Sequence, residues 1–403
     1  MLAVERGTIL RSFVEKSDIF ARTFVASGTY GFVPGEPSAY TQPLYGWFLI
    51  PLYWALGRHW LVVGLAQITV AACTAVIVLW IGRTFVSPRA GLVAAVFATL
   101  NPYLIWHDVH VNREILDQLA AAALFLLVLL AARTGRIWLA AAAGATAGVA
   151  ILGNSRLAAL PLVLAAYLAW NQRGRALPLA ATLVAATLVV LAPWAVRNRV
   201  QVGCFAITTD AHALWKANNE NTYKTLAEGK WIDDVPPLPG APVQTPEYET
   251  AIYAQTGRVL RIDECAQMRL YEHATIKFWR HHPGEKAKLA LQATRMLWQP
   301  QQTRTEGGPS SGVLKQWSEA VWAIPMYVLA IVGLFFVARS FAALALIFLI
   351  YNTAAAWVFA GATRYRISFD FVLALLAGAA IDRLLSRSRY TSSTPSVAAS
   401  AEN

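Results

Sequence analysis

Long apolar runs alternate with short polar stretches along most of this chain. Nine of the runs are apolar enough to cross a bilayer as helices, although an untilted span needs about 20 residues and several runs are shorter. The runs are residues 60–82, 90–106, 115–132, 137–153, 157–170, 177–195, 320–337, 341–360 and 368–382. The weakest of them is 157–170. The pattern predicts an all-α polytopic membrane protein, located in the cell membrane with several passes.

The composition supports this class. Of the 403 residues, 57% are hydrophobic and only 14% are charged. A soluble protein of this length cannot hide so much apolar surface in its core. The composition therefore excludes an ordinary soluble domain.

Arginine is distributed unevenly between the two sides of the predicted bundle. One side holds Arg83, Arg89, Arg133, Arg136, Arg173, Arg175, Arg339, Arg383, Arg387 and Arg389. The short loops of the other side hold only Arg58, Arg113, Arg156, Arg364 and Arg366. By the positive-inside rule the first side is cytoplasmic. The net charge of +11 is thus a topology signal and does not indicate a nucleic-acid partner.

The same pattern divides the chain into five predicted regions. These are an extracytoplasmic amphipathic and interfacial segment (1–59), a bundle of about six spans (60–195), an extracytoplasmic domain (196–318), a bundle of three spans (319–382) and a cytoplasmic disordered tail (383–403). Residues 43–57, rich in Trp and Tyr and too short to span, are predicted to form an interfacial helix. No apolar run or signal peptide accompanies residues 1–42. Either this short segment translocates unaided or a first transmembrane helix is missing, for example through a misassigned start; we expect the missing helix.

The extracytoplasmic domain is predicted to be mixed but mainly helical. A short β-like piece, CFAITT (204–209), is followed by a Pro-rich loop (233–246) and two helical stretches, the second beginning at Pro283. Cys204 and Cys265 both lie in this domain, while Cys73 lies in an apolar run. The two domain cysteines can pair if the domain faces an oxidising compartment, or remain two free thiols.

Six ionisable residues crowd the junction WHDVHVNREILDQ (106–118) between two apolar runs. Charges at the mouth of a span are costly unless partners, water or function accommodate them. Asp117 is explained as a helix-start charge that pairs with Arg113 four residues earlier. Glu114 is the better functional candidate, because a charged substrate at the membrane surface can meet it and Arg113 together. His107, Asp108 and His110 resemble a metal site only loosely.

Other candidates lie on the same predicted side. Glu15 and Asp18 belong to an N-terminal amphipathic helix, where solvated carboxylates are also common. Arg364 and Arg366 in GATRYRIS, and Arg197 after APW, suit a lipid phosphate because guanidinium offers a planar fork of donors. Anchoring to ordinary headgroups is an alternative role. Lys216 and Asn218 lie in a polar cluster with His212 and Asn219, which a simple loop also explains.

The order of several short motifs resembles a known superfamily. They are SGTYGF, PSAYTQPLYGWFLIPLYWALG, NPYLIW, NRE, APWAVRN, LWKANNENTY and RYR. In this order the chain resembles, over nearly its whole length, the polytopic GT-C glycosyltransferases, which include protein O-mannosyltransferases and the aminoarabinose transferase of lipid A. Gln42 and Ala217 depart from that pattern, where proline and glycine are usual. The family's first-loop aspartate corresponds to a position near Val14 and Glu15, with Asp18 close by.

The resemblance implies a GT-C-like helical bundle and an inverting sugar transfer from a polyprenyl phosphate to an acceptor hydroxyl. Glu15 or Asp18 would be the general base, and Glu114 would orient the acceptor or a phosphate-binding arginine. Arg197, Arg364 and Arg366 would stabilise the leaving phosphate. The remaining predicted substrate-binding residues are Asp108, Arg113, Lys216 and Asn218. Neither a cofactor nor a divalent metal is required.

The partners implied are the lipid-linked donor, a lipid, glycan or protein acceptor, and the bilayer. Which sugar and which acceptor are used stays open. Two other functions also stay open: a transporter or flippase of lipid-linked saccharides, and a non-catalytic relative that kept the scaffold. A transporter is expected to have polar or broken spans near the midplane and often inverted repeats, whereas the ionisable residues here gather at one interface.

Overall fold

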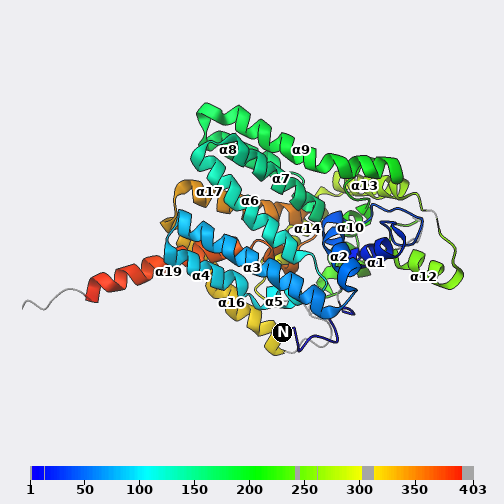
Figure 1. The fold of residues 1–403 in the computed structure, drawn as a ribbon, viewed down its shortest axis with the longest axis horizontal. Coiled ribbons are helices and arrows are strands. Elements are labelled where there is room, and N and C mark those ends of the chain that lie inside the picture. The colour runs from blue at the N-terminus through cyan, green and yellow to red at the C-terminus, as the bar shows by residue number, and fades with distance from the viewer. Residues whose placement is uncertain (1, 13, 241–245, 261, 302–312, 393–403) are drawn as a thin grey trace, which may run out of the picture.

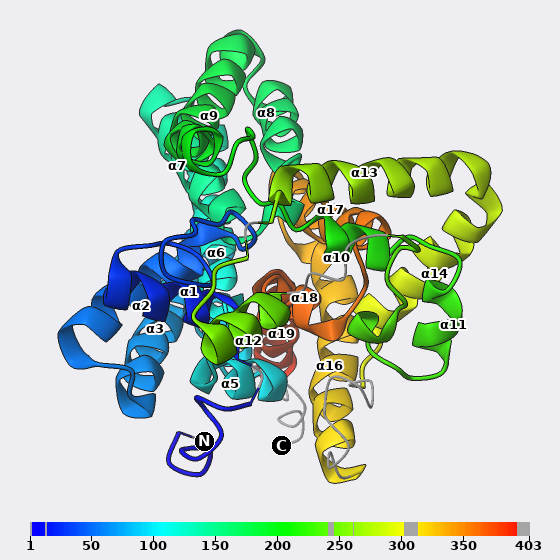
Figure 2. The same cartoon turned by 90° about the vertical axis from the view of Figure 1, so that its right-hand side faces the viewer.

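The protein is a bundle of helices with a second, smaller group of helices at one end (Figures 1 and 2). The computed structural model describes residues 2–12, 14–240, 246–260, 262–301 and 313–392. Its α-helices are α1 (Ser17–Ser27), α2 (Pro43–Leu56), α3 (Trp60–Phe85), α4 (Pro88–Thr99), α5 (Pro102–Val109), α6 (Glu114–Thr134), α7 (Ile137–Gly153), α8 (Leu160–Asn171), α9 (Ala176–Gln201), α10 (Ala211–Lys216), α11 (Thr222–Ala227), α12 (Pro246–Thr256), α13 (Glu264–His281), α14 (Pro283–Trp298), α16 (Val313–Gly333), α17 (Arg339–Val358), α18 (Thr363–Ile367) and α19 (Asp370–Ser392).

Each predicted span coincides with a helix, apart from 90–106, which is divided between α4 and α5. The two helices meet at an angle of 59°. Asn101 and Pro102 explain the break, because a residue before proline is disfavoured in the α conformation. The Asn101 side chain then caps α5 by accepting hydrogen bonds from the backbone N–H groups of Tyr103 and Leu104, at 3.0 and 3.3 Å. The predicted single span is therefore a bent pair.

Among the described residues, five helices are long and apolar enough to cross a membrane, or six if the bent pair counts as one span. The all-α, multi-pass fold class is thus confirmed. Apolar α7 has only 17 residues, and neither it nor α8 or α19 is among these helices. The crossing of these three remains a prediction.

Helix α6 lies at the centre of the bundle. Most of its side chains are buried, as expected for an apolar helix surrounded by others. Before its last turn, the partly exposed side chains form one stripe, which consists of Leu116, Leu119, Ala123, Leu127 and Leu130. Phe125 of α6 packs edge-on against Phe341 and Phe348 of α17 and Phe371 of α19, with ring centroids 5.2–5.8 Å apart. The outer helices α3 and α9 leave most of their apolar side chains exposed or only partly buried, as a lipid-facing surface requires.

The arginine-rich loops gather at one end of the bundle. Arg133 lies over the Phe85 ring, Gln172 donates to the carbonyl of Ala132, and Arg383 lies over Phe336. The helices α1, α2, α10, α12 and α13 gather at the opposite end (Figure 1). This is the separation of the two sides that the predicted topology requires.

The extramembrane part differs from the prediction in three respects. Residues 204–209 form no strand; within the described residues the only β pairing is an isolated bridge between Val33 and Glu36. Three helices, α12, α13 and α14, follow the Pro-rich loop, where two helical stretches were expected. Helix α9 continues to Gln201, beyond the predicted boundary at 195, so Arg197 and Asn198 are helical. The predicted helix from Pro283 is confirmed as α14, with proline in its first turn.

The C-terminal boundary also lies later than predicted. Helix α19 continues to Ser392, so residues 383–392 are helical and do not belong to a disordered tail. Residues 393–403 lie outside the described part of the chain.

Helices α7 and α9 pack closely through small residues of α7. A Cβ atom on Gly144 would collide with the backbone carbonyl of Leu183, and one on Gly148 would press on Val190 and the carbonyl of Thr187. The Thr187 hydroxyl donates a hydrogen bond of 2.9 Å to the Gly144 carbonyl. Close backbone approach of this kind is the main use of the GxxxG spacing in membrane helices.

Substituting Gly144 by valine is therefore expected to force α7 and α9 apart. Overpacking of this kind costs about 1–3 kcal/mol. We expect Gly144→Val to lower the midpoint of thermal unfolding in detergent. Gly174→Val is the matched control, because a Cβ there meets nothing within 4 Å. Equal midpoints for both variants would show that the α7–α9 contact contributes little to stability.

Candidate active site

A cavity with a volume of about 340 Å³ opens where the helical bundle meets the extramembrane helices. Its walls come from segments far apart in the sequence. They are residues 14–16, residues 40–42, His107 of α5, the turn between α5 and α6, the turn after α7, α10, residues 231–233 and residues 359–365. Four of the predicted site residues line it directly: Glu15, Arg113, Lys216 and Arg364. The cavity is therefore the candidate active site.

Arg364 joins two of the predicted carboxylates. It donates from Nε to Glu114 Oε1 at 2.7 Å and from Nη2 to Glu15 Oε1 at 3.0 Å. Glu114 is almost fully buried, whereas Glu15 is partly exposed to the cavity. Burial alone would lower the pKa of Arg364, but the charges of Glu114, Tyr365 and Glu15 hold it well above its ordinary value. Arg364 is thus a permanent cation with fixed orientation.

Arg113 is held in a similar way by the turn before α6. Its guanidinium donates to Gln42 Oε1 at 2.8 Å and lies 3.8 Å from Glu15 and 4.0 Å from Asp117. Burial lowers the pKa of Arg113, but the neighbouring carboxylates of Glu15, Asp117 and Glu114 raise it by more. Gln42 also donates to the Ser155 hydroxyl at 3.1 Å, so this departure from the family pattern links two walls of the cavity.

Arg156 is a site residue that the sequence analysis did not select. It follows α7, lines the cavity and is 9% exposed. Its guanidinium stacks on Tyr365, 3.9 Å from the ring centroid, and donates to the carbonyl of Ala360 at 3.0 Å. Among the described residues, no carboxylate forms an ion pair with it. Burial lowers the pKa of Arg156 to about 10. Its place among the few arginines on the arginine-poor side was the signal available in the sequence.

Asn112 adds a neutral hydrogen-bond donor to the wall. Its side chain is 2% exposed, and its Nδ2 group has no hydrogen-bond partner within the described part of the chain. A buried donor without a partner is costly, so such a group in a cavity is suited to binding a ligand.

A second charged group lines the cavity next to the extramembrane helices. Lys216 of α10 donates to Asp233 Oδ1 at 2.9 Å, and Asp210 caps the start of α10. Lys16 completes the group, with its Nζ 5.0 Å from the centre of the Tyr40 ring. Trp231 lies in the same wall.

Several predicted site residues lie outside the cavity lining. Asp18 accepts hydrogen bonds from the Tyr53 hydroxyl at 2.5 Å and from Arg58 Nε at 2.9 Å. Arg366 is fully buried between Asp370 and Glu319, at 3.1 and 3.3 Å. Asp108 is buried in α5. The observed partners of Asp18 and Arg366 are parts of the fold, whereas Asp108 Oδ1 has no hydrogen-bond partner among the described residues.

Arg197 and Asn218 also have structural partners. Arg197 donates to the backbone carbonyls of Ser38 and Tyr30, at 2.8 and 3.1 Å, and lies over Trp194. Asn218 accepts from Trp279 at 2.9 Å and donates to the carbonyl of Val358 at 2.7 Å. The first fixes the segment before α2, and the second joins the extramembrane helices to α17.

The His107, Asp108 and His110 cluster does not assemble into a metal site. Within the described residues, no group of three or more His, Cys, Asp or Glu side chains is arranged to hold a metal ion. His110 instead stacks on Trp106, and its Nδ1 contacts the Trp106 carbonyl at 2.8 Å.

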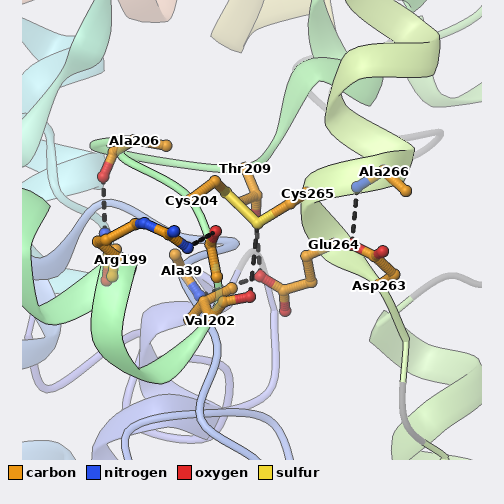
Figure 3. Close-up of a disulfide and its surroundings, with 12 residues drawn as sticks. Ala39, Arg199, Val202, Cys204, Ala206, Thr209, Asp263, Glu264, Cys265 and Ala266 are labelled. Carbon is orange, nitrogen blue, oxygen red and sulfur yellow. Dashed lines mark hydrogen bonds between the residues drawn. A yellow bond between two sulfur atoms is a disulfide. The ribbon is translucent and has the colours of Figure 1, made fainter.

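Cys204 and Cys265 form a disulfide, which resolves the alternative left open by the sequence. The bond ties the end of α9 to the start of α13 (Figure 3). Glu264, next to Cys265, accepts hydrogen bonds from the backbone N–H of Ala39 at 3.0 Å and from the Thr209 hydroxyl at 2.8 Å. The disulfide therefore helps to hold the segment that leads into the cavity wall at residues 40–42.

Comparison with known proteins agrees with the resemblance seen in the sequence. Residues 41–196 match the family model of dolichyl-phosphate-mannose-protein mannosyltransferase. This match confirms the resemblance over those residues. Gln42, Arg113 and Arg156 lie within the matched region. No curated protein matches the chain.

Two solved structures are similar at low identity. They are ArnT from Cupriavidus metallidurans bound to undecaprenyl phosphate, with 17% identity and a TM-score of 0.44, and the same protein in the apo state, with 18% identity and a TM-score of 0.39. Each comparison covers 97% of this chain and 78% of the other.

Removing the Glu114 charge is expected to destabilise the fold. Glu114→Gln leaves Arg364 with only Glu15 as an ionic partner, and loss of one member of a buried pair costs about 3 kcal/mol. We expect a lower midpoint of thermal unfolding. Glu228→Gln is the control, because the Glu228–Lys230 pair lies on the surface and such pairs contribute little. An unchanged midpoint for Glu114→Gln would show that the pair with Arg364 is not a stabilising element.

Proposed function

We propose that this protein is an inverting glycosyltransferase that moves a sugar from a polyprenyl phosphate to an acceptor hydroxyl on the extracytoplasmic face. The observation that carries the proposal is the cavity whose lining includes the Glu15 carboxylate and three guanidinium groups, those of Arg113, Arg156 and Arg364. The glycosyltransferase family match over residues 41–196 supports the same class of reaction.

Glu15 is the proposed general base. The acceptor oxygen attacks the anomeric carbon of the donor while its proton passes to the Glu15 carboxylate. The bond between the anomeric carbon and the phosphate oxygen breaks, and its electron pair remains on the phosphate. Because attack and departure occur on opposite faces of the carbon, the configuration inverts. Asp18 is a weaker candidate for the base, because it does not line the cavity and its carboxylate already accepts hydrogen bonds from Tyr53 and Arg58.

The arginines are suited to the leaving phosphate, whose negative charge grows as the bond breaks. Fixed cations that already point at this position stabilise it without reorganisation. Arg113 and Arg364 are held in place by carboxylates, whereas Arg156 has no such partner among the described residues. A phosphate beside Arg156 would compensate its buried charge, so we assign it the principal contact to the phosphate. Asn112 is positioned to donate a further hydrogen bond.

Two observations support the extracytoplasmic location of the cavity. The arginine-rich loops lie at the opposite end of the bundle, as the positive-inside rule requires for a cavity on the outer side. The Cys204–Cys265 disulfide lies at the cavity end, and structural disulfides belong to oxidising compartments.

Replacing Glu15 by glutamine tests the assignment of the base. Glutamine keeps the shape but cannot accept the proton, so we expect transfer to fall by about 10²- to 10⁴-fold. The measurement is movement of a labelled sugar from polyprenyl phosphate to envelope membranes, with undecaprenyl phosphate binding unchanged. Glu285→Gln, exposed on α14, is the control.

Three outcomes would change the interpretation of that experiment. Full transfer by Glu15→Gln would exclude Glu15 as the base. Loss of transfer in Asp18→Asn, with a normal unfolding midpoint, would give the role to Asp18. Passage of the donor lipid across a liposome bilayer without transfer of sugar would favour the transporter.

Replacing Arg156 by methionine tests the phosphate contact. We expect binding of undecaprenyl phosphate to weaken by about 10- to 100-fold, because a charge-assisted, forked contact is lost. Arg156→Lys is expected to recover only part of the affinity, since the lysine ammonium cannot donate two parallel hydrogen bonds as a guanidinium does. Arg199→Met is the control, on the exposed face of α9. Equal affinity in Arg156→Met and wild type would remove Arg156 from the phosphate site.

A further inference from the structure

The cavity contains two electrically distinct ends. The arginine end consists of Glu15, Arg113, Arg156 and Arg364. The domain end consists of Lys16, Asp210, Lys216 and Asp233, together with Trp231. Within each end the charged groups influence one another. Burial and the charges of Arg113 and Arg364 lower the pKa of Arg156, whereas the charges of Lys216 and Lys16 lower the pKa of Asp233 against the effect of burial. Glu15 belongs to the arginine end and Lys16 to the domain end. Because the two residues are adjacent in sequence, the two ends meet there.

The domain end is balanced in charge. It holds two lysines and two aspartates, and the closest pair, Lys216 and Asp233, is 2.9 Å apart. Burial raises the pKa of Asp233, but the hydrogen bond to Lys216 and the charges of Lys216 and Lys16 together lower it below its ordinary value, so Asp233 stays ionised. Burial and the charge of Lys216 lower the pKa of the neighbouring His212, which adds no positive charge at neutral pH. This end therefore has no excess charge to attract an anion.

The side chains of the domain end match the groups of a sugar. Aspartate oxygens accept hydrogen bonds from hydroxyl groups, and lysine donates to hydroxyl oxygens. Trp231 offers a broad apolar surface, half-buried in the wall, on which the C–H face of a pyranose ring can pack. The Trp231 backbone N–H donates to Asp234 at 2.7 Å, which fixes the segment that carries the ring. A few polar groups beside an aromatic surface are typical of small-molecule sites.

We infer that the domain end is the acceptor subsite and that the acceptor is an uncharged saccharide. This inference rests on the proposed function, because it assigns the arginine end to the donor phosphate. The acceptor ring lies against Trp231, and its hydroxyl groups contact Asp233, Asp210 and Lys216. One hydroxyl then projects toward Glu15, which takes its proton. The domain end has no net positive charge that would increase its affinity for an acceptor carrying a phosphate.

The test compares acceptors that differ only in charge. Purified full-length protein with a polyprenyl-phosphate sugar is given uncharged octyl glycosides, the same glycosides carrying a phosphate, or a peptide that contains serine and threonine. We expect transfer to the uncharged glycosides, with kcat/KM about tenfold or more above that for the phosphorylated forms. Preferred transfer to the phosphorylated glycosides or to the peptide would overturn the inference.

Substitutions at the domain end test the assignment directly. Trp231→Ala is expected to raise KM for the octyl glycoside about tenfold, with little change in kcat or in undecaprenyl phosphate binding. Asp233→Asn leaves Lys216 unpaired, so the preference is expected to shift toward the phosphorylated glycoside. Tyr223→Ala is the matched control, because this exposed aromatic residue of α11 lies outside the cavity. An unchanged KM in Trp231→Ala would remove the ring from the acceptor subsite.

The experiment separates failure of this inference from failure of the proposed function. If undecaprenyl phosphate binds and transfer depends on Glu15 but proceeds only to charged or peptide acceptors, the inference alone is wrong. If no acceptor receives sugar and undecaprenyl phosphate does not bind, the proposed function itself fails.

Discussion

The ion pair between Arg364 and Glu114 is the contact on which the site depends. The two residues are 250 positions apart in the sequence, and their side chains meet at 2.7 Å beside a buried junction of helices. A charge in such a place is tolerated only when a partner compensates it, so each residue requires the other. Through its second contact, to Glu15, Arg364 also brings the N-terminal segment to the same point. One guanidinium thus joins three separate parts of the chain.

The same requirement organises the rest of the cavity. Arg113 is compensated by Glu15 and Asp117, and Arg366 by Asp370 and Glu319. Arg156 differs, because its neighbours are the Tyr365 ring and a backbone carbonyl. Where the fold provides carboxylates, the arginines contribute to structure and orientation. Arg156 has no carboxylate partner among the described residues, so its charge can be compensated by a ligand. The proposed contact between Arg156 and the phosphate follows from this difference.

The extramembrane helices shape the cavity from outside the bundle. Lys216 and Trp231 reach it from this part, and Glu264 fixes residues 38–40 through a segment tied down by the disulfide. Asn218 and Lys286 hydrogen-bond to carbonyl groups of α17, which holds the outer helices against the bundle. The balanced charge of the domain end and the arginines of the other end are therefore held in a fixed relation. This arrangement is consistent with two substrates of different charge meeting at Glu15.

The sequence by itself determined the apolar helices and the arginine-rich loops that gather at one end of the bundle, because both are local patterns in the chain. It also selected Arg113 and Arg364, since charges at span ends stand out against apolar surroundings. Glu15 was selected through the family resemblance, and Lys216 as part of a polar cluster. Only the tertiary structure decided which charges face the cavity. Asp18 and Arg366 carry the same local signal as Glu15 and Arg364, yet their partners come from Arg58 and Glu319, tens of residues away. Arg156 was missed for the same reason: what distinguishes it is the absence of a carboxylate partner among the described residues, and that is a property of the folded chain.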